Sequence, residues 1–338
     1  MAESPRFTTP PAIPAVDEAA LRASLAQAVA AVRAENPLAP SITNTVTQNF
    51  VANAQLAVGG SAAMVYLPDE GEQVAAMGGA VYLNLGTLLP IYEQTIPRTA
   101  RACAEAGTPW VLDPVGLGIG QLRTELLQAV RATPPAIVRG NASEVIGLAK
   151  LWGLGSDRTA DKAADSTNDA TAATANGDDA VTAQEPSRSA TEADRRTTAN
   201  GPRGVDTTDE VDAARAAAAA LARFIGGAVA VSGPVDLVTD GTIVARAPGG
   251  SPLMCSVTGS GCSLGGVAAV YACVTDPFTA ALTATVLYNL AGARAAEHCA
   301  GPGSFQVVFL DELHRATPED VAAAPMTFER PLGETASC

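Results

Sequence analysis

Residues 110–116 read Trp-Val-Leu-Asp-Pro-Val-Gly: an apolar run of strand length, then an acid, then a turn started by proline. The same order, an apolar run followed by polar residues or glycine, returns along the chain. The other apolar runs are Ala62–Leu67, Ala80–Leu85, Ala136–Val138 and Ala228–Val231. Unbroken apolar runs of this length are typical of parallel strands that are buried on both faces.

Segments with helical spacing separate these runs. They are Asp17–Asn36, Glu70–Met77, Pro90–Ala106, Leu122–Ala132, Asn141–Leu151, Thr208–Ile225, Cys262–Val274 and Phe278–His298. Late in the chain, Thr239-Asp240-Gly241 lies between two short apolar runs, which predicts a hairpin. The predicted fold is α/β: a doubly wound, mostly parallel sheet with helices on both faces.

Composition limits the possible partners and the compartment. The 338 residues carry a net charge of −14, and 47% of them are hydrophobic. A net-negative chain without a basic stripe is repelled by phosphates, so we expect no nucleic-acid partner. No apolar run reaches the ~18 residues of a membrane helix, and no signal peptide is evident, so we expect no membrane association. The six cysteines are scattered, which favours reduced thiols and a cytoplasmic protein.

One long segment differs from the rest. Residues 156–203 contain Val181 as their only large apolar residue, so they cannot bury enough surface to offset their ordering entropy. We predict a disordered segment, either an insertion in one domain or a linker between two. The predicted folded domain spans 17–316, with a flexible N-terminal tail at 1–16 and a C-terminal tail at 317–338.

Polar and glycine-rich clusters follow the predicted strands. They are Asn84-Leu-Gly-Thr87, Asp113-Pro-Val-Gly116, Arg139-Gly-Asn141 and Ser232-Gly233. In doubly wound sheets, ligands bind at the carboxyl ends of the strands. The sequence therefore predicts a small-molecule site at this edge.

The stretch Val257-Thr-Gly-Ser-Gly-Cys-Ser-Leu-Gly265 precedes a predicted helix. Two glycines let the backbone approach a ligand closely, and a helix N-terminus favours an anion such as a phosphoryl group. Cys262 would lie at this N-terminus, where we expect its thiol pKa to fall. The alternative is a glycine turn before a core helix, with Cys262 packed as a small hydrophobic residue.

Three further side chains could carry chemistry. Asp113 and Glu144 could share a Mg²⁺ ion, although Asp113 could instead cap its turn and Glu144 could complete a helix capping box. Arg139 could bind phosphate oxygens, or it could be an exposed loop residue. His298 and His314 lack partners at ligand spacing and are expected at the surface.

Eight clusters occur together in one order, and the match runs from about residue 37 to about 313. They are 42–44 (Ile-Thr-Asn), 49–53 (Asn-Phe-Val-Ala-Asn), 60–64 (Gly-Ser-Ala-Ala-Met), 84–87 (Asn-Leu-Gly-Thr), 112–116 (Leu-Asp-Pro-Val-Gly), 139–144 (Arg-Gly-Asn-Ala-Ser-Glu), 258–262 (Thr-Gly-Ser-Gly-Cys) and 301–306 (Gly-Pro-Gly-Ser-Phe-Gln). In this combination the chain resembles the hydroxyethylthiazole kinases, which are ribokinase-like enzymes. The match resumes at Gly204-Val-Asp206, which implies that 156–203 is an insertion within one domain.

The resemblance implies ATP-dependent phosphorylation of the primary hydroxyl of 4-methyl-5-(2-hydroxyethyl)thiazole, in thiamine biosynthesis. By matching position, Cys262 is the catalytic residue beside the attacking hydroxyl, and Mg²⁺ is the cofactor. The remaining implied roles are thiazole binding by Met64, Gly259 and Asn44, ATP binding by Arg139 and Ser232, a phosphate loop of Thr258, Gly259, Ser260 and Gly261, and metal binding by Asp113 and Glu144. It also implies a homotrimer with sites between subunits.

The chain departs from the family pattern in two places. Pro40-Ser41 stands where the family commonly has His-Cys, and Ser232-Gly-Pro-Val-Asp236 stands where it has Thr-Gly-Glu-x-Asp. Ser232 keeps a hydroxyl, whereas Pro234 lacks the carboxylate. The alternatives are hydroxymethylpyrimidine kinase or another small-alcohol kinase, a related dehydratase acting on hydrated nicotinamide cofactors, and a non-catalytic protein that senses nucleotide or thiazole.

Overall fold

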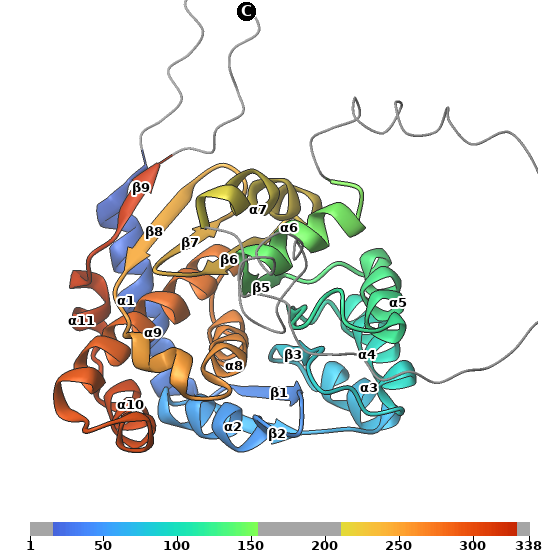
Figure 1. The fold of residues 1–338 in the computed structure, drawn as a ribbon, viewed down its shortest axis with the longest axis horizontal. Coiled ribbons are helices and arrows are strands. Elements are labelled where there is room, and N and C mark those ends of the chain that lie inside the picture. Colours follow the sequence, from blue (N-terminus) through green and yellow to red (C-terminus); the bar gives the residue numbers. More distant parts are fainter. Residues whose placement is uncertain (1–15, 155–210, 330–338) are drawn as a thin grey trace, which may run out of the picture.

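A computed structural model describes residues 16–154 and 211–329. Within these two stretches the strands form one sheet in the order β2-β1-β3-β4-β5-β6-β7-β8-β9 (Figure 1). Neighbouring strands from β2 to β6 are parallel, and those from β6 to β9 are antiparallel. The strands are β1 (Leu38–Ile42), β2 (Ser61–Met64), β3 (Val81–Asn84), β4 (Trp110–Asp113), β5 (Ile137–Asn141), β6 (Ala228–Ser232), β7 (Val235–Thr239), β8 (Val244–Pro248) and β9 (Thr327–Glu329).

Helices cover both faces of the sheet. One face carries α1 (Glu18–Glu35), α2 (Gln48–Ala57), α8 (Ser260–Ala272), α9 (Pro277–His298), α10 (Pro302–Arg315) and α11 (Pro318–Ala323). The other carries α3 (Pro68–Ala76), α4 (Tyr92–Ala106), α5 (Gln121–Ala129), α6 (Ala142–Leu151) and α7 (Val211–Ile225). In Figure 1 the two groups lie on opposite sides of the strands, with α1 and α11 at the left and α4 and α5 at the right. The predicted doubly wound architecture is confirmed.

The unbroken apolar runs reflect these two cores. Successive side chains of a strand point to opposite faces. Tyr82 of β3 and Val111 of β4 lie in the core under α8, whereas Leu83 and Leu112, the next residues along, lie in the core under α4. Because both faces are covered, both sets of side chains are apolar and the alternation typical of a half-exposed strand is absent from these two strands.

Helix α8 is the central helix of its face, and it positions the site. It packs against β1, β3 and β4 and is flanked by α2 and α9. Nearly all of its residues are buried, as expected for a helix that is apolar all round. The helices α8 and α2 pack closely at Gly266 of α8: a Cβ there would lie 2.8 Å from a methyl group of Val51 in α2.

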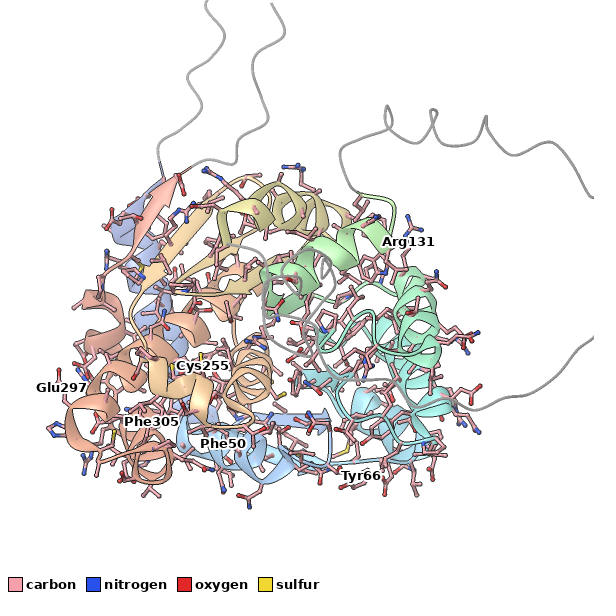
Figure 2. The ribbon with its side chains drawn as sticks, viewed as in Figure 1. Phe50, Tyr66, Arg131, Cys255, Glu297 and Phe305 are labelled. Atoms are coloured by element: carbon pink, nitrogen blue, oxygen red, sulfur yellow. The ribbon has the colours of Figure 1, made fainter. Side chains whose placement is uncertain are left out.

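An aromatic cluster holds α2, α9 and α10 together. The ring of Phe309 in α10 lies 6.2 Å from Phe50, 5.1 Å from Tyr288 and 5.8 Å from Phe305, between ring centroids. Figure 2 shows Phe50 and Phe305 on the same part of the molecule, below α9.

Within the described residues, no helix is both long and apolar enough to cross a bilayer.

The structure corrects two parts of the sequence prediction. The strand β1 and the helices α2 and α10 were not predicted. Pro40 interrupts the apolar run of β1, and it nevertheless lies in register with Ala63 of β2. The predicted C-terminal tail from 317 was also wrong in its first part, since α11 and β9 are ordered and β9 pairs with β8. The predicted insertion at 156–203 and the N-terminal tail, up to residue 15, lie outside the described residues.

The C-terminal segment is held by local and distant contacts. Thr317 and Asp320 form a capping box at the start of α11. From α1, Arg22 donates to the carbonyl oxygens of Ala322 and Ala324 at 2.7 and 2.9 Å. These contacts close the fold, and the sequence alone did not reveal them because their partners lie about 300 residues apart.

Candidate active site

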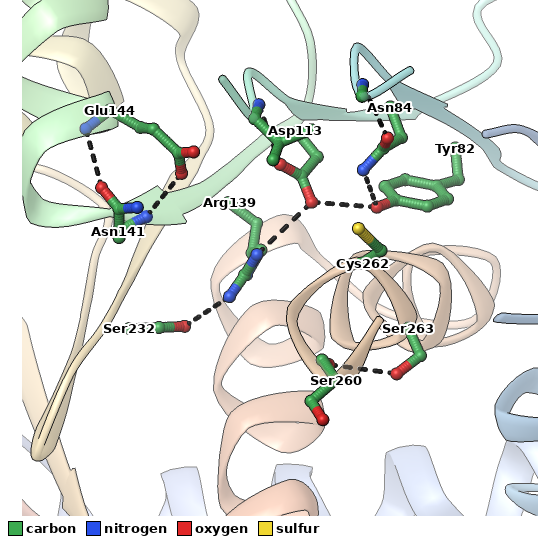
Figure 3. A network of polar contacts seen from close by, with 12 residues as sticks. Tyr82, Asn84, Asp113, Arg139, Asn141, Glu144, Ser232, Ser260, Cys262 and Ser263 are labelled. Carbon is green, nitrogen blue, oxygen red and sulfur yellow. Dashed lines mark hydrogen bonds and ion pairs between the residues drawn. The ribbon is translucent and has the colours of Figure 1, made fainter. Parts of the chain in front are cut away.

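The polar side chains predicted at the strand ends do meet at one edge of the sheet. Asn84 ends β3 and lies in register with Asp113 at the end of β4, while Asn141 of β5 lies in register with Ser232 of β6. The N-terminus of α8 reaches the same edge, and its Cys262 sulfur points toward these side chains (Figure 3). The parallel topology therefore brings five segments of the chain to one place.

One side of this edge is built around Arg139. Its Nη2 donates to Ser232 Oγ at 3.0 Å, and its Nη1 lies 3.4 Å from Asp113 Oδ2 (Figure 3). Its Nε is buried without a hydrogen-bond partner within residues 16–154 and 211–329. The guanidinium lies against the start of α8, where a Cβ on Gly261 would be only 2.7 Å from Nη1. Arg139 is thus a buried site residue, and the alternative of an exposed loop arginine is wrong.

The other side of the edge is a chain of hydrogen-bonded side chains that ends at Cys262. Asn84 Nδ2 donates to the Tyr82 hydroxyl at 2.9 Å, and Tyr82 donates to Asp113 Oδ2 at 3.0 Å. Asn44 Nδ2 donates to Asn84 Oδ1 at 3.0 Å and lies 3.5 Å from Cys262 Sγ. We call the set Ser232, Arg139, Asp113, Tyr82, Asn84, Asn44 and Cys262 the buried network.

The Cys262 thiol does not behave as its place at a helix N-terminus suggested. Burial raises its pKa to about 11, with the nearby Asp113 carboxylate adding to the rise and Arg139 opposing it. The predicted lowering is therefore wrong, because burial and the Asp113 charge outweigh the opposing effects. At neutral pH the thiol is protonated, hydrogen-bonded and poor as a proton acceptor.

The alternatives weighed for the two carboxylates are both confirmed, without removing them from the site. Asp113 Oδ1 accepts from Val115 N at 3.1 Å and so caps its turn. Glu144 completes a capping box with Asn141, and its Oε1 also accepts from Gly116 N at 3.1 Å. Burial and the charge of Asp113 raise the pKa of Glu144. Asp113 ends β4 and Glu144 lies in the first turn of α6, directly after the neighbouring strand β5, so the two carboxylates belong to the same edge of the sheet.

This donor set fits a magnesium ion bound together with a substrate. Mg²⁺ prefers oxygen ligands and is commonly held by one or two carboxylates plus substrate phosphates. Asp113 and Glu144 offer such carboxylates and repel each other electrostatically. The described part of the chain has no group of three or more acidic, histidine or cysteine side chains that could hold a metal by itself. Phosphate oxygens would have to complete the coordination.

The remaining predicted residues lie around the network. Gly259 adopts a φ of +90°, and a Cβ there would lie 3.0 Å from the side chain of Thr47, so glycine is required by both conformation and space. Ser260 Oγ donates to backbone carbonyls of the loop, and Thr258 is exposed. Met64 ends the edge strand β2 and packs against the core under α8.

Sequence reasoning missed two site residues. Tyr82 stands in an apolar strand, where a lone tyrosine gives no sign that its hydroxyl is bonded at the site. Burial and Asp113 raise its pKa well above the ordinary value, so it remains a hydrogen-bond donor. Thr47, in the loop before α2, lies beside Cys262, and its side chain lowers the pKa of that thiol. The sequence did contain one indication that Tyr82 belongs to the site: it stands two residues before Asn84, and therefore on the same face of the strand.

Comparison with known proteins decides the family. The model of the hydroxyethylthiazole kinase family matches residues 29–184 and 193–319. The chain belongs to the hydroxyethylthiazole kinase family. It is an enzyme, a kinase, with the expected ribokinase-like fold. It is 47% identical over 311 residues to the hydroxyethylthiazole kinase of Bifidobacterium adolescentis, covering 90% of this chain and 94% of that one.

Other members of the kinase family match over a similar share of the chain. The enzyme of Bifidobacterium longum strain DJO10A is 44% identical over 94% of this chain and 93% of its own. A solved structure of a hydroxyethylthiazole kinase protein from Pyrococcus horikoshii OT3 superposes with a TM-score of 0.69 and 26% identity. It covers 90% of this chain and 98% of that one.

Proposed function

We propose that this kinase transfers the terminal phosphoryl group of ATP to the primary hydroxyl of 4-methyl-5-(2-hydroxyethyl)thiazole, as a step of thiamine biosynthesis. The observation that carries the proposal is the buried network: it joins a helix N-terminus and a buried arginine to a thiol in a chain of this family. Phosphoryl transfer depends mainly on positioning and charge stabilisation, which such a network supplies.

The nucleotide binds at the Arg139 side in this proposal. Arg139 and Ser232 contact ATP, and the unpartnered Nε of Arg139 is a buried donor suited to a phosphate oxygen. The N–H groups of the first turn of α8, with the 258–261 loop, have no intrahelical acceptor and face the same edge. Burial disfavours the charge of Arg139, but Asp113 and Glu144 outweigh it and raise its pKa, so the cation persists.

Asp113 and Glu144 would hold Mg²⁺ with the phosphates. The ion, when bound, neutralises negative charge on the phosphate oxygens. In the protein itself, the two carboxylates are kept in place by Arg139 on one side and by the backbone N–H groups of Val115, Gly116 and Asn141 on the other.

The acceptor alcohol binds at the Cys262 side. Asn44, Gly259 and Met64 contact the thiazole, and the substrate hydroxyl lies beside Cys262 Sγ. Because the thiol has a raised pKa, it is a hydrogen-bonding and positioning group before it is a base. In a loose transition state the alcohol needs little deprotonation before attack, so a weak acceptor suffices.

We further propose a cytoplasmic homotrimer in which Met64 contributes to a site shared with a neighbouring subunit. The strand β2 that carries Met64 is at the edge of the sheet. Large apolar side chains nearby are exposed, with Val46 at 62%, Leu56 at 54% and Leu67 at 48% of full exposure. Light scattering of the purified chain tests this assembly; a monomer that is fully active would contradict it.

A coupled assay of ADP release tests the reaction. The purified chain is incubated with ATP and Mg²⁺ and with the thiazole alcohol, with hydroxymethylpyrimidine, or with no acceptor. We expect ADP release that depends on the thiazole alcohol and exceeds the other two reactions. Preference for hydroxymethylpyrimidine would instead assign the related pyrimidine kinase activity, and the absence of acceptor-dependent ADP would exclude the kinase proposal.

A further inference from the structure

Tyr82 occupies the middle of the buried network, under α8. Its side chain is fully buried in the sheet. Directly opposite is Gly265, in the interior of α8, where a Cβ would lie 2.4 Å from Cε2 and 2.8 Å from the hydroxyl oxygen of Tyr82. Glycine is unfavourable inside a helix, so its presence at this point indicates a packing requirement. That requirement is the phenol ring: only a residue without a side chain leaves room for it.

The tyrosine hydroxyl connects the two sides of the site. It donates to Asp113 Oδ2 and accepts from Asn84 Nδ2, at 3.0 and 2.9 Å. Such a bridge needs a group that donates and accepts at once, which a hydroxyl can do and an aliphatic or phenyl side chain cannot. Beyond Asp113 lies Arg139 (Figure 3). Beyond Asn84 lie Asn44 and then Cys262.

We propose that Tyr82 is a positioning residue for phosphoryl transfer, and that Gly265 is the residue that admits it. The Tyr82 hydroxyl holds the Asp113 carboxylate and the Asn84–Asn44 pair in a fixed relation, and so sets the phosphate side of the site relative to Cys262. This inference rests on the proposed function, because it concerns the same reaction. It predicts that the hydroxyl acts on the rate of transfer and little on substrate binding.

The test is Tyr82→Phe, which keeps the ring and removes the hydroxyl. We expect kcat to fall about tenfold, while KM for the thiazole alcohol stays within about twofold. The matched control is Tyr271→Phe. Tyr271 is a buried residue of α8 in the same core as Tyr82, and its hydroxyl has no hydrogen-bond partner in the described residues. Its kcat and KM should equal those of the wild type.

A purely structural role for Tyr82 gives a different result. Removing the hydroxyl leaves the buried Asn84 amide without an acceptor, so some loss of thermal stability is expected in either case. Turnover is therefore measured at a temperature where circular dichroism shows both variants folded. A lower melting temperature with unchanged kcat would overturn the inference. If the wild-type protein itself released no ADP in response to the thiazole alcohol, the proposed function would be refuted instead.

The variant Gly265→Ala tests the second part of the proposal, that Gly265 makes room for the Tyr82 ring. The added methyl must displace the Tyr82 ring, so we expect a fall in kcat comparable to that of Tyr82→Phe. In the double variant the further loss should be no more than about twofold, since both changes remove the same bridge. Losses that multiply to about a hundredfold would show that Gly265 acts independently of the hydroxyl and would overturn its assignment.

Discussion

Two polar regions join distant segments of this chain, and they differ in exposure. In the buried network, the ion pair of Arg139 and Asp113 has side chains 10% and 0% exposed, at 3.4 Å. The second region, which we call the C-terminal closure, is the contact between α9 and α11. There Arg294 binds Asp320 in a forked pair at 2.8 and 3.2 Å, with side chains 34% and 30% exposed. A surface pair contributes ~0–1 kcal/mol. A buried pair is weak evidence for stability, because desolvating two charges offsets their attraction.

The comparison separates two uses of charge. The C-terminal pair is satisfied by the protein itself and holds α11 against α9. The buried pair is long, and Arg139 keeps an unpartnered donor, so the network has unused capacity for a ligand. Variants of the two regions should therefore differ in kind: those of the network change turnover, and those of the closure change only stability.

The largest expected effect comes from Arg139→Ala. Loss of the guanidinium removes stabilisation of phosphate charge, and kcat/KM for ATP should fall at least about a hundredfold. Steady-state kinetics with varied ATP measure this. Arg294→Ala, the matched change at the C-terminal closure, should leave kcat/KM within about twofold; equal losses in both variants would remove the distinction between the regions.

Arg139→Ala also leaves the buried Asp113 carboxylate unpaired, which can cost about 3–5 kcal/mol of stability. Arg139→Lys is therefore measured alongside it, because it keeps the charge and loses the fork. We expect a folded enzyme whose KM for ATP is raised. Wild-type kinetics in Arg139→Lys would show that charge alone suffices.

A smaller loss is expected for Cys262→Ala and Cys262→Asp. A positioned base contributes about 10²–10⁴-fold, and a thiol protonated at neutral pH should contribute less, about tenfold. Both variants should therefore retain measurable ADP release. Complete loss of turnover in Cys262→Ala, with unchanged binding of the thiazole alcohol by calorimetry, contradicts the role of Cys262 as a weak base.

Asp236 extends the comparison, because it is a buried carboxylate whose hydrogen bonds come from uncharged donors. It accepts from Gly233 N at 2.8 Å, and burial raises its pKa to about 6. Between about pH 4 and 6 the folded state then binds the proton more tightly than the unfolded state, so this group makes stability fall as pH rises through that window. Asp236→Asn should remove about 2 kcal/mol of the wild-type difference between about pH 4 and pH 7, measured by urea unfolding. An unchanged pH dependence would contradict the buried charge.

The smallest effect is expected at the C-terminal closure. Arg294 lowers the pKa of Asp320 to about 2, so their pairing stabilises the fold above about pH 4 and is lost as pH falls toward 2. Because solvent screens the pair, Arg294→Ala should cost about 0.5–1 kcal/mol at about pH 7 and less at about pH 3. Urea unfolding at both pH values checks this; a larger cost under the more acidic condition would be inconsistent with it.

Much of the fold was predictable because its signals are local. The apolar runs of β3, β4, β5 and β6 predicted buried parallel strands, and the polar clusters after them predicted which edge carries the site. The strand β1 was missed because Pro40 is unusual in a strand, and tertiary pairing with β2 and β3 overrides that local preference. The segment of α11 and β9 was missed because its anchors, such as Arg22, are distant in sequence.

The sequence by itself determined the fold class, the edge of the sheet that bears the site and most of its residues, since periodicity and strand-end motifs depend on neighbours in the chain. Only the tertiary structure decided the state of the Cys262 thiol and the place of Tyr82. The thiol pKa depends on burial and on the charge of Asp113, and the Tyr82 bridge depends on the space that Gly265 leaves. Both are properties of groups brought together from separate strands and from α8, which no local pattern records.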